Sequence, residues 1–283
     1  MINDVFVCPL CGGKLACDGK RLFCADGHSF DVSSAGYVNL LRPGKLRNRS
    51  SGDDKGMVSA RTKFLSAGYY EKNRDHLISI VKNHANGGGI AVDAGCGEGY
   101  YTNAVNVFCP DFKVVGIDAS KHACEAAAKQ SKRLGISENV AYAVASLAEM
   151  PLADNEADLV ISLFSPCDYN EFARVLKRGG KVIIGSSGKK HLTELKKILY
   201  GEDNVRDNET LDHASRADGT GLRLVERSTV SYKTSVEGNE AIFELFSMTP
   251  YYWRTPKSGV EALEKLDLLE VTVEVDYTVL ELQ

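Results

Sequence analysis

Four residues near the start of the chain have the types and the spacing of a zinc site. Cys8 and Cys11 form one short pair, and Cys24 and His28 form a second, in the pattern C-x2-C-x12-C-x3-H. Zn²⁺ prefers a tetrahedron of thiolate and imidazole ligands, and two such pairs can wrap around one ion. The spacing therefore predicts one structural zinc ion whose four positions are all filled by the protein.

The segment between the two pairs is typical of a β-hairpin. Asp18 and Gly19 form a favoured two-residue turn, with apolar residues alternating on both sides of it. Such a hairpin would return Cys24 and His28 to the first pair. Free cysteines in a reduced protein are the alternative. We expect no disulfide framework, because the later cysteines lie in segments that read as core.

A second group of residues has the pattern of a nucleotide-binding loop. Asp93 precedes three glycines, Gly95, Gly97 and Gly99, and Asp118 follows about twenty residues further on. Glycines let the backbone come close to a ligand, and an acid at the end of the next strand accepts hydrogen bonds from ribose hydroxyls. NAD-binding loops normally read G-x-G-x-x-G, whereas here the third glycine comes one residue early. The loop therefore predicts a nucleotide-like ligand and departs from the NAD pattern; a turn whose glycines serve packing alone is the alternative.

The segments that must position this loop alternate between strands and helices. Residues 59–85 are expected to be helical with a break at 68–70, and the long alternating segments 222–232 and 268–280 suit an antiparallel pair at a sheet edge. Alternation of strands and helices predicts a mostly parallel, doubly wound sheet, which binds ligands at the carboxyl ends of its strands. Further strands are expected at 90–93, 113–117, 140–144, 159–163 and 181–185, and further helices at 101–108, 121–134 and 170–176.

Length and composition fit one large domain with a small one attached. The 283 residues are 43% hydrophobic, which is enough for one large hydrophobic core and a small additional domain that a zinc ion stabilises. We divide the chain into a zinc-binding module at 1–41, a basic linker at 42–58 and a main domain at 59–283. The start lacks a basic region followed by an apolar run, and no stretch approaches the roughly 18 apolar residues of a membrane span. We therefore expect a cytoplasmic protein with no membrane attachment.

Charge is distributed unevenly along the chain. The formal net charge is −4, but residues 1–50 carry seven Lys or Arg and four Asp or Glu, a local balance of +3. The excess peaks at Arg42, Lys45, Arg47 and Arg49, in a loop that also contains proline and glycine. Such a loop can follow nucleic-acid phosphates, whose neutralisation releases counterions. A solvated linker with incidental charge explains the pattern equally well.

The zinc residues and the glycine loop, in this order, resemble a known family. The loop after Asp93, together with Asp118, is similar to that of class I S-adenosylmethionine (SAM)-dependent methyltransferases. With the zinc spacing ahead of it, the chain resembles the RlmA-type 23S rRNA (guanine-N(1))-methyltransferases over nearly its whole length. One departure is Gly56, where the family pattern has an acid, and it bears on the shape of the linker. The further motifs that carry the resemblance are Gly36-Tyr-Val-Asn-Leu-Leu41, Gly52-Asp53, Ala60-Arg61, Phe64-Leu-x-Ala-Gly68, Asp93-x-Gly-Cys-Gly-Glu-Gly-Tyr-Tyr-Thr102, His191-Leu, and Ser247-Met-Thr-Pro250 with Trp253.

The resemblance implies an α/β fold, namely a Rossmann-like doubly wound sheet with antiparallel edge strands, plus the small N-terminal zinc-binding module. It implies transfer of a methyl group from SAM to N(1) of a guanine in a hairpin of 23S ribosomal RNA. One structural zinc ion and a homodimer whose paired modules hold the RNA are expected. The residues expected to bind SAM are Tyr70, Asp93, Gly95, Gly97, Glu98, Gly99, Tyr100, Asp118 and His191.

The expected chemistry would be helped by a group that removes a proton. Guanine N(1) carries a proton and is a poor nucleophile until that proton begins to leave, so a general base must come within hydrogen-bond reach. Asp168, His191 and Asp154 are candidates because they lie in loops expected at the rim, and the sequence does not select among them. For His191, a role in SAM binding or loop packing is the preferred interpretation.

The sequence leaves three further alternatives open. Tyr251, Tyr252 and Trp253 can stack on an unpaired base, or they can belong to the core or to an interface. The chain can be a methyltransferase of a small molecule with a purely structural zinc ion, which RNA dependence of methyl transfer would test. It can also be an RNA-binding protein that keeps the fold without catalysis, which measured SAM binding would test.

Overall fold

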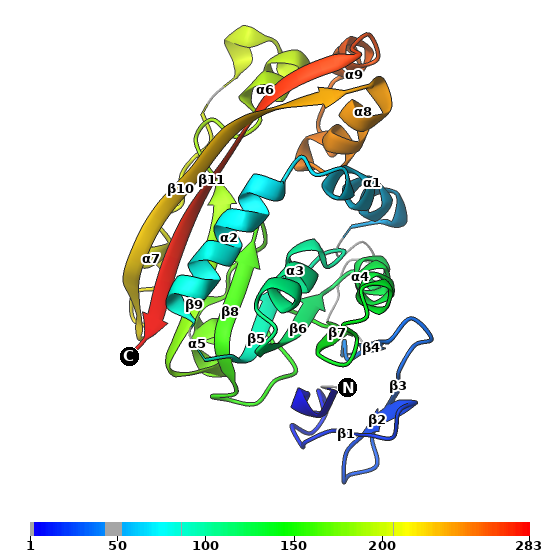
Figure 1. Ribbon diagram of the computed structural model, residues 1–283, viewed down its shortest axis with the longest axis vertical. Helices are drawn as coiled ribbons and strands as arrows, with labels where there is room; N and C mark the ends of the chain where they lie inside the picture. Colours follow the sequence, from blue (N-terminus) through cyan, green and yellow to red (C-terminus); the bar gives the residue numbers. More distant parts are fainter. Residues whose placement is uncertain (1–2, 43–52, 86, 206) are drawn as a thin grey trace.

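The computed structural model describes residues 3–42, 53–85, 87–205 and 207–283. An eight-stranded sheet runs through the molecule, and a three-stranded sheet lies at its foot (Figure 1). The strands are β1 Ala16–Cys17, β2 Arg21–Phe23, β3 Ser29–Asp31, β4 Tyr37–Asn39, β5 Gly89–Ala94, β6 Phe112–Asp118, β7 Val140–Val144, β8 Ala157–Leu163, β9 Leu176–Ser187, β10 Leu222–Glu237 and β11 Leu268–Leu282. The helices are α1 Lys55–Ser66, α2 Glu71–His84, α3 Tyr100–Phe108, α4 Lys121–Arg133, α5 Tyr169–Val175, α6 Thr193–Tyr200, α7 His213–Arg216, α8 Asn239–Ser247 and α9 Lys257–Leu263, with short 3-10 turns η1 Asn3–Val5, η2 Glu202–Asn204 and η3 Pro250–Trp253. In these described ranges, no helix is both long and apolar enough to cross a membrane.

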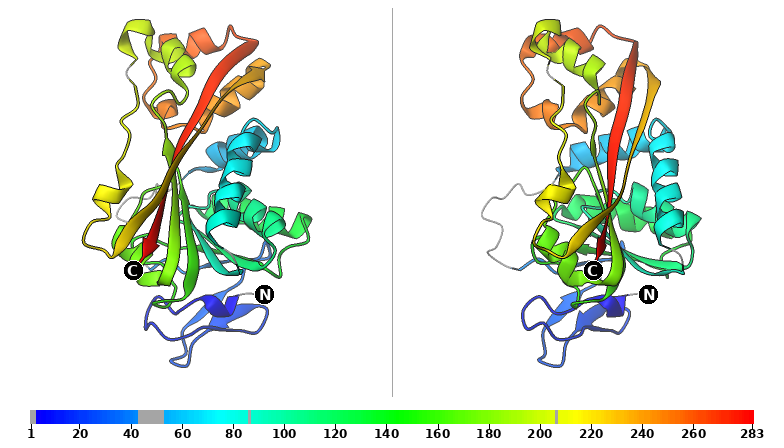
Figure 2. Two further views of the ribbon diagram at one scale, coloured as in Figure 1. Left: turned by 60° about the vertical axis from the view of Figure 1, so that its left-hand side comes forward. Right: turned by 90° about the vertical axis from the view of Figure 1, so that its left-hand side faces the viewer.

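The main sheet has the strand order β10-β11-β9-β8-β5-β6-β7-β4. The neighbours from β9 to β4 pair in parallel, whereas β11 is antiparallel to both β9 and β10. The central strands are apolar almost throughout because helices cover both faces, with α2, α3 and α4 packed on one face and α5 and α7 on the other. The predicted doubly wound sheet with an antiparallel edge pair is confirmed. Figure 2 shows the long strands β10 and β11 extending beyond the parallel part of the sheet.

Several elements differ from the expected bounds for local reasons. α1 begins at Lys55, earlier than the expected residue 59, because the Asp54 carboxylate caps the helix by accepting a hydrogen bond from the Met57 backbone N–H at 2.9 Å. The expected break before α2 is confirmed, with Gly68 in the left-handed region at φ 91°. β10 and β11 pair along their whole lengths and therefore run further than the sequence pattern predicts.

The N-terminal module is joined to the main sheet along one edge. Its last strand, β4, lies parallel to β7. Phe6 forms an isolated bridge with Leu152, and the Val7 backbone N–H donates a hydrogen bond to the Pro151 carbonyl oxygen at 3.0 Å. Apolar residues of the module therefore share one core with the sheet. The predicted division at residues 41 and 58 stays a prediction.

The carboxyl ends of the parallel strands meet at one edge of the sheet, which we call the rim. The loops that follow β5, β6, β8 and β9 lie at this rim, since parallel strands all end on the same side. The arrowheads of β8 and β9 mark its direction in Figure 1. Most of the residues expected to bind a cofactor lie in these loops.

Candidate cofactor and zinc sites

The four predicted metal ligands come together in the N-terminal module. Their ligand atoms all lie within 4.8 Å of one another. The Sγ atoms of Cys8 and Cys24 are 3.6 and 3.4 Å from His28 Nδ1, and Cys11 Sγ is 3.7 Å from Cys24 Sγ. Bonds of about 2.3 Å to sulfur and about 2.0 Å to nitrogen give tetrahedral edges of roughly 3.5 to 3.8 Å. The cluster therefore fits Zn²⁺ and leaves no open position for water.

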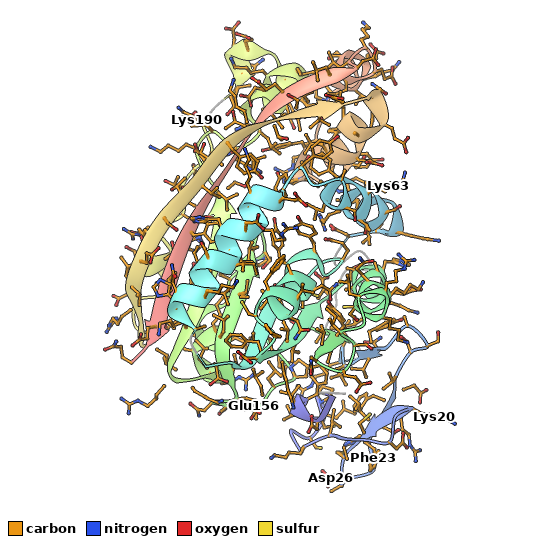
Figure 3. The ribbon with its side chains drawn as sticks, in the orientation of Figure 1. Lys20, Phe23, Asp26, Lys63, Glu156 and Lys190 are labelled. Atoms are coloured by element: carbon orange, nitrogen blue, oxygen red, sulfur yellow. The ribbon has the colours of Figure 1, made fainter. Side chains whose placement is uncertain are left out.

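The predicted hairpin closes this site, with one difference in its turn. β1 and β2 pair antiparallel as expected. The turn falls on Gly19 and Lys20, one residue later than predicted, since the Asp18 N–H donates to the Arg21 carbonyl oxygen at 3.2 Å. The Asp18 carboxylate also accepts hydrogen bonds from the backbone N–H groups of Lys20 and Arg21, at 3.0 Å each. Figure 3 shows Lys20 on the outer side of the module, away from the main sheet.

The three glycines between β5 and α3 serve two different purposes. All have φ in the left-handed region, at 92° for Gly95, 54° for Gly97 and 85° for Gly99. A Cβ at Gly95 would lie 2.4 Å from the Ser165 Cβ, and one at Gly99 would lie 2.7 Å from Tyr142 Oη. A Cβ at Gly97 would meet nothing closer than 3.8 Å. Gly95 and Gly99 are therefore required for close packing, whereas at Gly97 there is room beside the backbone.

Asp118 holds this loop from the end of β6. Its Oδ2 accepts a hydrogen bond from the Gly97 backbone N–H at 3.0 Å, and its Oδ1 accepts one from the Ser120 backbone N–H at 2.7 Å. Burial raises the pKa of Asp118, while these two backbone hydrogen bonds lower it. Each carboxylate oxygen retains a lone pair, so Asp118 can still accept hydrogen bonds from ribose hydroxyls.

Asp93 lies at the end of β5 and is almost fully buried. Its Oδ2 accepts a hydrogen bond from the Thr102 hydroxyl at 2.6 Å. Burial, helped by the negative charges of Asp118 and Glu98, raises the pKa of Asp93 from 3.8 to about 7. A nearby cation would stabilise its ionised form, and SAM carries two cationic groups, an ammonium and a sulfonium.

Tyr70 and His191 contact each other at the rim. Tyr70 Oη lies 3.4 Å from His191 Nε2, and His191 Nδ1 accepts a hydrogen bond from the Glu274 backbone N–H at 3.2 Å. This bond leaves the proton on Nε2, which makes the ring a donor toward Tyr70. Burial lowers the pKa of His191 to about 4, so the ring is neutral near pH 7. His191 also faces Phe164, with the two ring centres 5.7 Å apart.

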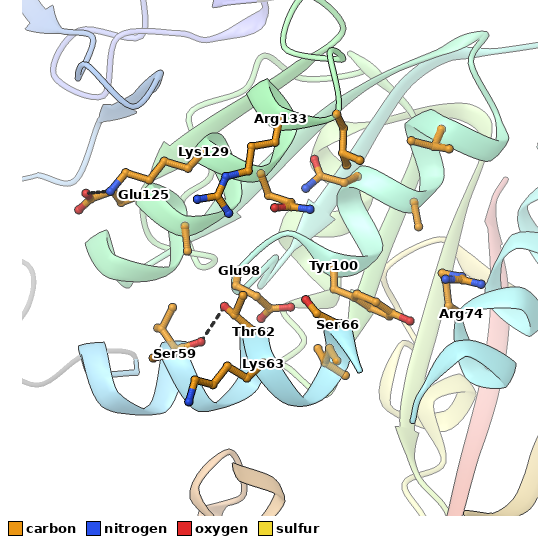
Figure 4. Close-up of a pocket in the computed structure, with 18 of the residues that line it drawn as sticks. Ser59, Thr62, Lys63, Ser66, Arg74, Glu98, Tyr100, Glu125, Lys129 and Arg133 are labelled. Atoms are coloured by element: carbon orange, nitrogen blue, oxygen red, sulfur yellow. Dashed lines mark hydrogen bonds and ion pairs between the residues drawn. The ribbon is translucent and has the colours of Figure 1, made fainter. Parts of the chain in front are cut away.

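The side chains of Glu98 and Tyr100 face a groove of about 740 Å³ between α1, α3 and α4 (Figure 4). Burial raises the pKa of Glu98, and it raises that of Tyr100 to about 12. The groove also contains the exposed ion pair of Lys129 with Glu125 at 2.6 Å. The expectation that Glu98, Gly99 and Tyr100 contact SAM stays a prediction.

Two of the candidate bases, Asp154 and Asp168, lie at opposite ends of the parallel strands. Asp154 precedes β8 and pairs with Arg174, which lies just before β9, at 2.7 Å. The chain between β7 and β8 must return from the rim to the amino ends of the strands, and Figure 3 shows Glu156 at the foot of the sheet. The expectation that Asp154 lies at the rim is therefore wrong. Asp168 does lie there, where it caps α5 by accepting a hydrogen bond from the Glu171 N–H at 3.1 Å.

Of the four basic residues predicted to meet phosphates, the structure describes Arg42. Its guanidinium donates to the Pro9 carbonyl oxygen and pairs with Glu149 at 2.7 Å. In this position Arg42 joins the zinc-binding module to the segment that follows β7. The remaining three, Lys45, Arg47 and Arg49, lie outside the described residues.

Arg61 connects the cofactor loop to the C-terminal part of the chain, a role that the sequence did not suggest. Its guanidinium pairs with Asp53 and donates to the Met248 carbonyl oxygen at 3.2 Å. The Asp53 carbonyl oxygen accepts a hydrogen bond from the Ser120 hydroxyl at 2.7 Å. Ser120 in turn donates its N–H to Asp118. Asp53 and Arg61 both belong to motifs that carry the family resemblance, and this was the one signal in the sequence that these two residues matter.

Comparisons with known proteins agree with this geometry. Two family models match the chain, one described as "Methyltransferase domain" over residues 86–240 and one described as "RlmA, N-terminal" over residues 6–45. The crystal structure of the YcgJ protein of Bacillus subtilis is similar in fold, with a TM-score of 0.51 at 15% identity, over 73% of this chain and 98% of that one.

Relatives are similar along almost the entire chain. A candidate 23S rRNA (guanine-N(1)-)-methyltransferase of Bacillus subtilis, YxjB, is 34% identical over 96% of this chain and 95% of its own. The 23S rRNA (guanine(748)-N(1))-methyltransferase of Streptomyces fradiae is 30% identical over the same shares. The chain belongs to the RlmA family of 23S rRNA (guanine-N(1))-methyltransferases, with an N-terminal zinc ribbon and a class I SAM-dependent methyltransferase domain.

Proposed function

We propose that this chain transfers the methyl group of SAM to N(1) of a guanine in a hairpin of 23S ribosomal RNA. The observation that carries the proposal is the similarity to rRNA methyltransferases over 96% of the chain, through the zinc-binding module as well as the methyltransferase domain. A zinc ion with four protein ligands cannot activate water, so the module would take no part in the chemistry, and we assign it the role of holding RNA.

The residues of the rim fit SAM in charge and in space. Asp118 has free acceptor capacity for ribose hydroxyls, and the loop is open above Gly97. Asp93 offers a carboxylate that a cationic group would stabilise. Bound SAM supplies an electrophilic methyl group, so the protein has mainly to align it with the acceptor and to exclude water. Tyr70 and His191 would close the rim beside the cofactor.

Asp168 is the base that the geometry favours. Asp154 lies at the other end of the strands, and Nε2 of His191 carries a proton and donates it toward Tyr70. In Asp168, Oδ1 is engaged in the helix cap, whereas within the described parts of the chain Oδ2 has no hydrogen-bond partner. That oxygen can accept the N(1) proton of guanine as the bond between N(1) and the methyl carbon forms.

The same proposal includes the partners of the enzyme. Lys45, Arg47 and Arg49 would meet RNA phosphates. A homodimer would place two zinc-binding modules around one RNA. Light scattering of the purified protein at several concentrations tests whether the protein is a dimer. Ribosomal RNA as substrate implies that the enzyme works in the cytoplasm.

The decisive experiment measures transfer of labelled methyl from SAM to unmodified large-subunit rRNA, followed by mapping of the labelled nucleotide. We expect the label at guanine N(1). Cys8→Ser should lose transfer to RNA while it keeps SAM binding, because the module and the cofactor loop are separate sites. Proven SAM binding without label on rRNA would instead favour a small-molecule acceptor with a purely structural zinc ion.

A further inference from the structure

We propose that Phe164 is the surface on which the target guanine stacks during methyl transfer. The inference rests on the proposed function, and it adds a substrate-positioning residue to the rim. Three observations on this residue carry it: its backbone conformation, its place beside the cofactor loop, and the partly free surface of its ring.

Phe164 has a backbone conformation that aromatic residues rarely adopt. Its φ is 53°, in the left-handed region, directly after the last residue of β8. Two hydrogen bonds hold the turn: the Phe164 N–H donates to the Gly185 carbonyl oxygen at 2.9 Å, and the Ser165 hydroxyl donates to the Ala94 carbonyl oxygen at 2.6 Å. Such conformations persist where the surroundings enforce them, and they concentrate at functional sites.

This turn packs directly against the cofactor loop. The residue after Phe164 is Ser165, whose Cβ would be 2.4 Å from a Cβ placed on Gly95. The Ser165 hydroxyl also lies 2.8 Å from that of Ser162. Phe164 is therefore one residue away from a rigid contact with the loop that we assign to SAM. A base resting on its ring would lie close to the donor.

The ring of Phe164 packs against His191 on one side, and part of the residue is exposed to solvent. It faces His191 with ring centres 5.7 Å apart and planes inclined by 31°. His191 is itself fixed by Tyr70 and by the Glu274 backbone. Phe164 as a whole residue is nevertheless 44% exposed, which is unusual for an aromatic residue at the end of a central strand. A flat apolar partner would cover this surface.

A guanine that is methylated at N(1) needs such a partner. N(1) lies on the Watson–Crick edge, so the base must come from a loop or be splayed out of a helix, and proteins hold unpaired bases by stacking them on aromatic rings. Trp253 in η3 is more exposed, at 66%, but no described contact joins its ring to the cofactor loop. Phe108 has the same 44% exposure as Phe164, yet it ends α3, at the far end of the helix from the glycine loop.

Three single variants test the proposal on the full-length, zinc-loaded enzyme. Phe164→Leu removes the aromatic face, Phe164→Tyr keeps it, and Phe108→Leu is the matched control at equal exposure. We expect kcat/KM for large-subunit rRNA to fall by about tenfold or more in Phe164→Leu. It should stay within about twofold of wild type in the other two variants, and calorimetric SAM affinity and Tm should be unchanged in all three.

A fluorescent variant provides a second measurement. The chain has one tryptophan, Trp253, so the double variant Phe164→Trp, Trp253→Phe carries its only indole at the rim. Stacking on guanine should quench its emission when rRNA is added, and a chain with Trp253→Phe alone has no tryptophan signal. Unchanged emission at an RNA concentration that gives full binding would overturn the proposal.

The remaining outcomes separate this proposal from the proposed function. Wild-type activity in Phe164→Leu would refute the stacking role and leave rRNA methylation standing. Loss of SAM affinity in parallel with activity would assign Phe164 to the cofactor wall. Loss of activity in Trp253→Ala but not in Phe164→Leu would move the stacking surface to η3. No transfer to rRNA by the wild-type enzyme would remove both proposals together.

Discussion

At the scale of single residues, the site depends on carboxylates whose surroundings differ. Asp93 is buried with one hydroxyl partner, Asp118 has two backbone N–H partners, and Asp168 caps a helix at the rim. The first is suited to a cation, the second to ribose hydroxyls, and the third to proton removal. Each assignment leads to a different measurable behaviour.

Asp93 should make SAM binding depend on pH. Its pKa of about 7 means that the ionised form, which attracts a cation, is lost as pH falls below 7. We expect calorimetric SAM affinity to weaken between pH 8 and 6, by at most about tenfold per pH unit. Asp93→Asn should bind SAM weakly at all pH values. A wild-type affinity that is flat across this range would refute the assignment.

The same raised pKa has a consequence for stability without ligand. The unfolded chain loses the Asp93 proton near pH 3.8, whereas the folded chain keeps it up to about pH 7. The folded state therefore binds more protons in this window, and the contribution of Asp93 to the free energy of unfolding falls as pH rises through it. Comparison of Asp93→Asn with wild type by urea denaturation should show this slope in the wild type alone.

Asp168→Asn should separate catalysis from structure. Asparagine caps helices as well as aspartate, so the hydrogen bond to Glu171 and the stability should be kept. The base is lost, however, and kcat should fall by roughly 10² to 10⁴. SAM affinity and KM for rRNA should change little. Full activity in this variant would exclude Asp168 as the base.

At the scale of elements, the turn between β5 and α3 is held by packing from two other segments. The turn after β8 fills the space beside Gly95, and α4 and β7 fill the space beside Gly99. These segments are distant in sequence, so the loop has its shape only when the sheet is assembled. Replacing a glycine in it tests packing as well as backbone freedom.

Gly95→Ala should be far more disruptive than Gly135→Ala. Both glycines have left-handed φ, 92° and 71°, so both variants bear about 1–2 kcal/mol of backbone strain. Only at Gly95 would the new Cβ overlap Ser165, at 2.4 Å, since nothing lies within 4 Å at Gly135. We expect an additional loss of about 1–3 kcal/mol in unfolding free energy, together with loss of SAM binding. Equal stability of the two variants would show that the turn after β8 moves aside and accommodates the new Cβ.

At the scale of the whole molecule, the zinc-binding module is both a separate site and part of the sheet. Its metal ligands lie outside the eight-stranded sheet, but β4 pairs with β7, and Phe6 packs in the same core as the central strands. Removal of zinc should therefore have two effects of different size. The module should unfold, while the cofactor loop, supported by other elements, should remain.

Cys8→Ser, or treatment with a strong chelator, should abolish transfer to rRNA and lower Tm, because the site loses a metal that contributes directly to folding. SAM affinity should stay within a few-fold of the native value. Cys17→Ser is the matched control, since Cys17 lies on β1 of the same module but outside the ligand cluster. If the control lost RNA transfer to the same extent, the metal would not be the cause.

The sequence by itself determined the features that depend on neighbours along the chain. The zinc ligands, the glycine loop, Asp118 and the alternation of strands and helices were all predicted, because spacing and periodicity fix local geometry. The hairpin turn was predicted within one residue, and the error arose from a side-chain acceptor, Asp18, that replaces a backbone group.

Only the tertiary structure decided which loops lie together at the carboxyl ends of the parallel strands. Asp154 and Asp168 are equally plausible in sequence, yet the return of the chain between β7 and β8 puts Asp154 at the far edge. The link from Arg61 to Met248 joins positions 187 residues apart, and the exposure of Phe164 follows from a turn held by Gly185 and Ala94. These features depend on long-range packing, which spacing and periodicity along the chain do not reveal; for Asp53 and Arg61 the one signal in the sequence was their place in motifs of the family resemblance.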